Sequence, residues 1–110
     1  MIIADFIHAF EKKDYKALSE CFADQCRLFD YCPLRIKNEN YYVYGKKAID
    51  MFYHNKFVLG GLGVMDPHIV DERTVNFYIS YGGPINHAVA TIESYDEHSG
   101  LIKELVIRPA

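Results

Sequence analysis

The sequence contains no tryptophan, only three cysteines and no apolar run near the ~20 residues that a membrane span needs. Its net charge of −3 leaves it without the basic face that nucleic-acid binding requires, so we expect neither a membrane nor a nucleic-acid partner. The cysteines, Cys21, Cys26 and Cys32, are odd in number and match no zinc spacing. We expect free thiols in a reducing compartment, the cytoplasm. The first residues carry an aspartate and no basic stretch, which is unlike a signal peptide.

The short motifs of several catalytic classes are also missing. There is no G-x-S-x-G segment and no phosphate-binding loop, and the "GGLG" stretch at 60–63 follows a predicted helix, the reverse of a dinucleotide fingerprint. The five histidines show neither H-x-H nor H-x3-H spacing and no accompanying carboxylate pattern. We therefore expect no metal site and no cofactor.

What is present has the composition of a globular domain, with 50% apolar and 25% charged residues, and we expect one domain over residues 1–110. Its first half predicts three helices. Apolar side chains at i, i+3, i+4 and i+7 predict an amphipathic helix over residues 2–12. Asp14 is placed to cap a second helix over 14–23, and a third is expected over 46–57.

The remaining segments predict strands and loops. A strand in "CRLFDY" precedes a polar loop or lid at 33–41 and a short extended piece in "YYVYG". After residue 68 the period changes to 2, and "HIV", "TVNFYISY", "INHAVATIESY" and "LIKELVIRP" predict strands joined by hairpin turns. Segment 58–67 is expected to be a connection. This order predicts an α+β domain with helices packed on a curved antiparallel sheet, with no helix in 73–108 and no parallel strand pair.

The stretch "CRLFDYCP" holds the strongest candidate for a functional residue. Alternation places Asp30 on the face of the strand that carries its small apolar side chains, Cys26, Leu28 and Cys32. Burying a lone carboxylate costs several kcal/mol unless it is paired, hydrogen-bonded or protonated. Arg27 lies on the opposite face, and Arg35 reaches Asp30 only if the loop folds back. Asp30 is therefore either an acid–base group whose pKa is raised by desolvation, or a carboxylate that bonds the following turn.

Three segments, in this order, resemble the NTF2-like superfamily, and in particular its SnoaL-like and ketosteroid-isomerase-like members. They are "FIHAFEKKDYKALSECFADQCRLFD", "YGKKAIDMFY" and "YDEHSGLIKELVI", and the resemblance covers nearly the whole chain. It implies a conical α+β fold whose helices and strongly curved antiparallel sheet enclose a deep apolar pocket for a small hydrophobic molecule. It also implies a homodimer through the outer face of the sheet. The chemistry stays open, because this fold carries isomerases, dehydratases, cyclases, hydrolases and non-catalytic proteins.

The resemblance can be followed residue by residue. Asp30 stands where ketosteroid-isomerase-like members carry their general base, and Tyr53 where they carry a supporting tyrosine. Their two oxyanion donors are replaced, the tyrosine by Phe6 and the protonated aspartate by Thr91, and Phe22 replaces another tyrosine. Losing one such donor typically costs ~10²–10³ in rate, which argues against steroid isomerisation. Phe6, Phe22, Tyr53 and Thr91 become candidate ligand-binding residues.

His87 is a second candidate for acid–base chemistry. It has the same parity in its strand as Thr91, so both face the pocket if Thr91 does. A neutral histidine beside Asp30 would form an acid–base pair, as in scytalone-dehydratase-like relatives. His87 also follows "GGPIN" directly, and the alternative is a solvated side chain at the start of the strand. Tyr53 is likewise either a pocket residue or a core tyrosine with one hydrogen bond.

Together these observations predict a small-molecule-binding protein with an apolar pocket. As an enzyme it would be a cofactor-free isomerase, lyase or hydrolase that uses Asp30 and His87. The alternative is a ligand-binding or dimerising domain without catalysis. For the homodimer we expect the sheet face that is too apolar to stay solvated to be buried between two copies. That face is predicted to carry Tyr78, Ala88, Ala90 and Ile92.

Overall fold

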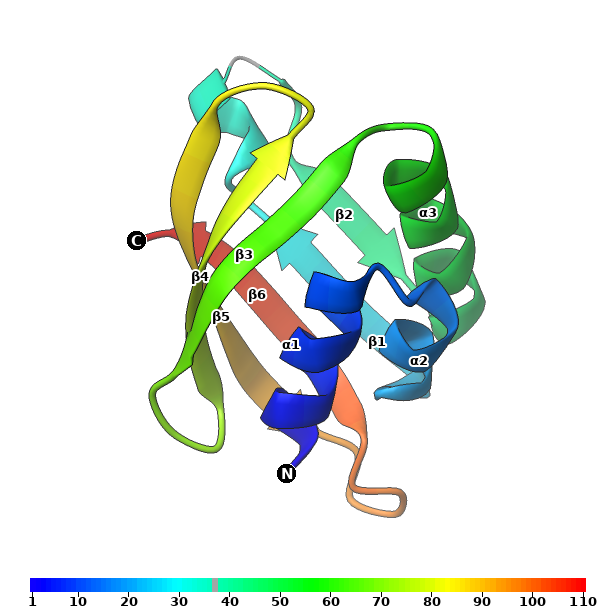
Figure 1. Ribbon diagram of the computed structural model, residues 1–110. Helices are drawn as coiled ribbons and strands as arrows, with labels where there is room; N and C mark the ends of the chain where they lie inside the picture. The colour runs from blue at the N-terminus through cyan, green and yellow to red at the C-terminus, as the bar shows by residue number, and fades with distance from the viewer. Residues whose placement is uncertain (37) are drawn as a thin grey trace.

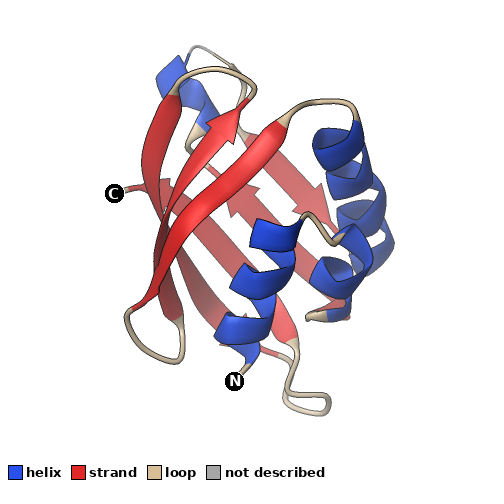
Figure 2. Ribbon diagram, viewed as in Figure 1, coloured by secondary structure: helices blue, strands red, loops and turns tan. Residues whose placement is uncertain are grey.

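The computed structural model describes residues 1–36 and 38–110 as three helices on one side of a curved six-stranded sheet (Figures 1 and 2). The helices are α1 (Ile2–Lys12), α2 (Tyr15–Glu20) and α3 (Lys46–Val58), with a short 3-10 helix, η1 (Pro33–Ile36). The strands are β1 (Phe22–Asp30), β2 (Tyr41–Tyr44), β3 (Leu62–Ile69), β4 (Thr74–Tyr81), β5 (Ile85–Tyr95) and β6 (Ile102–Pro109). Their order across the sheet is β2-β1-β6-β5-β4-β3. The predicted α+β class is confirmed.

One strand pair runs against the prediction of a purely antiparallel sheet. β1 and β6 are parallel, with Leu28 beside Leu105 and Asp30 beside Ile107, while the other neighbouring pairs are antiparallel. The expectation that no strands pair in parallel was wrong, because β1 enters the sheet from the helices and not from a hairpin with β6. Residues 73–108 contain no helix, as predicted.

The helices follow their predicted positions closely. Asp14 caps α2, since its Oδ1 accepts the backbone N–H of Ala17 at 3.0 Å. α2 ends at Glu20, three residues earlier than the predicted end at residue 23, because β1 already begins at Phe22. α3 follows Gly45, whose φ of +95° lies in the region that favours glycine.

β3 is longer than the sequence predicts. It begins at Leu62, inside the segment expected to be a connection, and turns Leu62 and Val64 toward the core. A bulge interrupts its pairing with β4 between Met65 and His68. Asp66 within this bulge has a φ of +53°. The extra residues shift the alternation of side chains, which hides the period of 2 in the sequence.

The loop predicted at 33–41 is in part regular structure. Residues Pro33–Ile36 form η1, and Tyr41 is already the first residue of β2. Asn40 ties the segment together, because its Oδ1 accepts the backbone N–H of Leu34 at 3.1 Å. Lys37, which this prediction also covers, lies outside the described residues.

The interior is packed with aromatic rings where the resemblance implies a deep cavity. The ring of Phe10 in α1 lies within 6.0 Å, between centroids, of four others: Phe6, Tyr53, Phe57 and Phe77. Phe22 is fully buried in the same core, 6.2 Å from Phe6. Five hollows of the described chain are lined by other residues than Phe6, Phe22 and Tyr53. These predicted ligand-binding residues are therefore core residues of the closed structure.

β5 faces the core with the opposite set of side chains to the predicted one. The residues that point inward and are fully buried are Ala88, Ala90 and Ile92. His87 lies on the outer face, exposed and stacked on Tyr78 with ring centroids 4.7 Å apart, and Thr91 has the same orientation. The predictions that His87 and Thr91 face a pocket, and that the three inward residues cover a dimer interface, were wrong. Ala88 lies opposite the buried Phe77, where only a small side chain leaves room for the ring.

Among the described helices, none combines the length and the apolar character that crossing a membrane requires.

Candidate functional site

Asp30 is the one charged side chain that is fully buried among the described residues, with 1% of its surface exposed. It is the last residue of β1, and neutral groups hold both of its carboxylate oxygens. The backbone N–H of Cys32 donates to Oδ1 at 2.9 Å, and the hydroxyl of Tyr81 donates to Oδ2 at 2.5 Å. No lysine or arginine of the described chain forms an ion pair with it. The sequence left two alternatives for Asp30, a desolvated carboxyl and a carboxylate bonded to the following turn. In the structure Asp30 is both buried and hydrogen-bonded to the turn.

The electrostatics of the site are dominated by burial. Desolvation raises the pKa of Asp30 from its ordinary 3.8 to about 6, and the hydrogen bonds from Tyr81 and Cys32 oppose the rise only in part. Burial, and then the charge of Asp30, raises the pKa of the Tyr81 hydroxyl and of the Cys32 thiol. At neutral pH the pair thus consists of a carboxylate close to its titration range and a phenol that keeps its proton.

Two further tyrosines surround the carboxyl. Tyr41 lies directly opposite Asp30 in the β1–β2 pair, and its ring contacts that of Tyr81 with centroids 5.6 Å apart. Tyr53 is fully buried, and its hydroxyl has no hydrogen-bond partner among the described residues. Burial, followed by the charges of Asp30 and Tyr41, raises the pKa of Tyr53. An unpaired buried hydroxyl costs about 1–3 kcal/mol, so Tyr53 offers a donor to a group that enters the core here.

A surface hollow of about 580 Å³ adjoins Tyr81. It forms where η1 approaches the loop between β4 and β5, the cyan and yellow segments at the top of Figure 1. Small-molecule sites usually occupy ~300–1,000 Å³. Tyr81 belongs to both features, because it lines the hollow and bonds Asp30. The residues around the hollow are Arg35, Asn38, Tyr81, Gly82, Gly83, Pro84 and Asn86.

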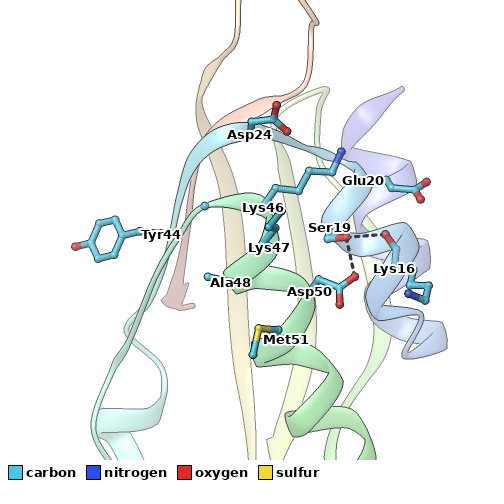
Figure 3. A pocket seen from close by; sticks show the side chains of 11 residues that line it. Lys16, Ser19, Glu20, Asp24, Tyr44, Lys46, Lys47, Ala48, Asp50 and Met51 are labelled. Carbon is cyan, nitrogen blue, oxygen red and sulfur yellow. Dashed lines mark hydrogen bonds between the residues drawn. The ribbon is translucent and has the colours of Figure 1, made fainter.

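A larger hollow, of about 1,110 Å³, lies away from Asp30, between α2 and the start of α3 (Figure 3). Its charged lining carries both signs: Lys16, Lys46, Lys47, Glu20, Asp24 and Asp50. In this hollow the hydroxyl of Ser19 forms hydrogen bonds to the carbonyl oxygen of Lys16 at 2.9 Å and to the carboxylate of Asp50 at 3.4 Å. No predicted site residue lines this hollow, and its charges balance each other, so we do not regard it as the functional site.

The structure brings Asp30 and Tyr53 together and separates them from His87 and Thr91. It also adds Tyr81 and Asn86, which the sequence did not single out, and it places Arg35, considered there only as a partner for Asp30, at the hollow. Tyr81 has the parity of the buried Phe77 and Ile79, which indicates an inward side chain at the end of β4. Its contact with Asp30, 51 residues away in the chain, depends on the order of the strands, which local patterns do not reveal.

Within residues 1–36 and 38–110, no three histidine, cysteine, aspartate or glutamate side chains gather closely enough to hold a metal ion. The cysteines are free and buried, and burial raises the pKa of the Cys21 thiol to about 11. Thiols with raised pKa values are poor nucleophiles.

No protein family model matches the sequence, and no curated protein matches it. Solved structures match the fold along nearly the whole chain. An NTF2-like protein of unknown function from Cytophaga hutchinsonii is 12% identical with a TM-score of 0.66, over 99% of this chain and 87% of that one. A SnoaL-like protein from Burkholderia thailandensis is also 12% identical with a TM-score of 0.63, over 98% and 91%.

A third match is a hypothetical protein with a ketosteroid isomerase-like fold from Catenulispora acidiphila, solved in complex with trimethylamine. It is 12% identical with a TM-score of 0.63, over 99% of this chain and 85% of that one. The chain therefore adopts an α+β fold of the NTF2-like, cystatin-like type, and the fold that the resemblance implied is confirmed. At this identity the matches show the fold alone and leave the chemistry to the site.

The raised pKa of Asp30 predicts a decline of stability with pH. The folded carboxyl binds its proton more tightly than the unfolded one. Its contribution to the free energy of unfolding is therefore fully present below the unfolded pKa of 3.8 and is lost as pH rises through about 6. The difference of about two pKa units corresponds to about 3 kcal/mol. Asp30→Asn should remove most of this decline and be at least as stable as the wild type at neutral pH. Urea unfolding across this pH range measures it.

Asp24→Asn is the matched control for this measurement, because Asp24 lies exposed on the same strand. It should leave the decline unchanged. An Asp30→Asn variant with the pH profile of the wild type would show that Asp30 is not the group responsible.

A second prediction concerns Tyr81. Its hydroxyl stabilises the charged form of Asp30, so Tyr81→Phe should raise the pKa of Asp30 further, above about 6. Titration of the Asp30 carboxyl carbon by NMR gives the value directly. Tyr95→Phe is the control, since Tyr95 bonds the carbonyl of Glu72 at a distant turn. A pKa that falls, or a wild-type pKa at or below 3.8, would contradict the desolvated site.

Proposed function

We propose that this protein binds a small, partly apolar molecule at the hollow beside Tyr81, and that the Asp30–Tyr81 pair exchanges a proton with it without a cofactor. The observation that carries the proposal is that one side chain, Tyr81, both lines an open hollow and bonds a buried carboxyl whose pKa is about 6. A group with a pKa near the working pH is well suited to general acid–base catalysis. This reaction class includes isomerases, lyases and hydrolases.

The proton path follows from the bonds. Asp30 is buried, so a molecule in the hollow meets Tyr81 first. The oxygen of Tyr81 can accept a proton from the molecule as its own proton moves to Oδ2 of Asp30, and the reverse shift returns a proton to the product. If the Tyr81 ring moves aside, the molecule reaches Asp30 directly and meets the unpaired hydroxyl of Tyr53. In both cases Asp30 is the base, and Tyr81 relays the proton or admits the molecule.

Binding without catalysis is the second candidate. It is favoured by the burial of Asp30 and by the Cys32 N–H bond, which together give the carboxyl a structural role in the turn after β1. In that case the hollow holds a ligand, and Asp30 orients Tyr81. The cytoplasmic location predicted from the sequence stays a prediction.

Deuterium uptake separates the two candidates. In D₂O the wild type should speed the exchange of the α-protons of small ketones, followed by proton NMR, relative to buffer. Asp30→Asn should lose about 10²-fold or more of this rate, the usual contribution of a general base, and should keep binding. Asp24→Asn should retain the full rate. Bound ketones that do not exchange faster than in buffer, or an Asp30→Asn variant with the wild-type rate, would leave binding without catalysis as the function.

We also propose a homodimer through the outer face of the sheet. Its support is an aromatic patch on β1, the residue after β1, and β2. The patch consists of Phe29, Tyr31, Tyr42 and Tyr44, with neighbouring ring centroids 5.9–6.4 Å apart. Tyr42 and Tyr44 are 54% and 61% exposed. Exposed tyrosines are enriched at interfaces, and a two-fold pairing of such a patch buries it on both copies.

Sedimentation measures this association. We expect a dimer at micromolar concentration and a shift toward monomer in the double variant Tyr42→Ser, Tyr44→Ser. Leu59→Ser, at an exposed residue after α3, should behave as the wild type. A wild-type monomer at micromolar concentration would refute the proposed dimer.

A further inference from the structure

The hollow beside Tyr81 has a lining that is unusual for this chain. Among the described residues that line it, Arg35 is the one charged side chain, and none of the others is acidic. The four other pronounced hollows of the described chain each combine cations with aspartate or glutamate. A protein with a net charge of −3 therefore has, next to its buried carboxyl, a recess whose described lining carries one positive and no negative side chain.

Two donors in this recess lack partners among the described residues. No carboxylate lies within ion-pair distance of Arg35, whereas Arg27 pairs with Glu104 and Arg108 with Glu93. The Nδ2 of Asn86 is buried and makes no hydrogen bond. A buried donor without an acceptor costs stability that a bound acceptor recovers. That cost applies to Asn86, whereas Arg35 is exposed and contributes a positive charge. Together the two groups match a ligand that brings negatively charged oxygen atoms.

We propose that the recess recognises the carboxylate of a small organic acid, with Arg35 and Asn86 as its donors. This inference rests on the proposed function, because it names the class of molecule that the same hollow takes. The planar guanidinium of Arg35 suits the two oxygens of a carboxylate. Arg35, the one cation among the described lining residues, balances one negative charge. A phosphate group carries about −1.5 to −2 near pH 7 and would lie close to the charge of Asp30.

The carboxylate also fixes where the rest of the molecule lies. With its charged end at Arg35 and Asn86, the molecule extends past Tyr81, whose ring lines the hollow and whose hydroxyl is bonded to Asp30. The atoms next to the carboxylate would then meet the acid–base pair. The ligand class is thus an acid with a short apolar body.

The test is NMR titration of the nitrogen-15-labelled protein with phenylacetate and with phenylacetamide, which have nearly the same shape and differ in charge. The reporters are the side-chain amide of Asn86, the Nε–H of Arg35 and the backbone N–H groups of Gly82 and Gly83. Phenylacetate should shift them along a saturable curve with a Kd of about 1 mM or tighter, the range expected for a ligand of about ten heavy atoms. Phenylacetamide should bind about tenfold more weakly or not at all.

Arg35→Gln should weaken phenylacetate binding about tenfold or more, because it removes the charge-assisted pair. Arg108→Gln, an exposed arginine on the outer face, should leave the titration unchanged. Equal binding of the two probes at these reporters would overturn the carboxylate assignment while the proposed small-molecule site stands. An Arg35→Gln variant with the wild-type Kd, or shifts with inorganic phosphate but not with phenylacetate, would overturn it too. If none of the probes shifts the reporters, and no ketone exchange depends on Asp30, the carboxylate assignment and the proposed function both fail.

Discussion

The candidate site depends on keeping a carboxyl group out of water without a cation beside it. An isolated buried carboxylate costs many kcal/mol, and Asp30 tolerates burial because a backbone N–H and the Tyr81 hydroxyl bond its oxygens. The Cys32 bond is local to the turn after β1, whereas the Tyr81 bond joins the end of β1 to the end of β4. These two strands are separated in the sheet by β6 and β5. The curvature that brings the two strand ends together therefore also allows Asp30 to be buried. Because its hydrogen-bond partners are neutral, the pKa of Asp30 stays raised.

The packed interior decides how this carboxyl can act. Rings from α1, α3 and β4 fill the space under the sheet, so a ligand does not occupy the centre of the cone in the closed structure. Displacing Tyr81 would break one hydrogen bond to a charged group, a loss of about 1.5–3 kcal/mol. A ligand that displaces Tyr81 and still binds with a millimolar Kd must offset this loss in addition to the net binding free energy of about 4 kcal/mol.

Much of the fold was predictable from local patterns. Apolar spacing placed α1, the capping aspartate at residue 14 placed the start of α2, and alternation placed Asp30 inside. The predicted orientation of the β5 side chains was wrong, and the reason lies in how it was predicted. Ala88, Ala90 and Ile92 are the more apolar set, and by residue type they belong inside, but the alignment to a distant family put Thr91 in their place. The distant resemblance predicted the order of the elements correctly. It predicted the register of one strand incorrectly, and that error inverted the predicted orientation of every side chain in the strand.

The same error explains why the donors of the site were missed. The family pattern looks for oxyanion donors deep in the cone, and here Phe6 is a core ring and Thr91 faces outward. The free donors lie at the rim, on η1 and at the start of β5, in segments that meet only through the tertiary fold. A negative charge that develops on a bound molecule would be stabilised by Arg35 at the rim, and Arg35 does not reach the core. In the proposed function, a proton that leaves or reaches Asp30 would therefore pass outward through Tyr81.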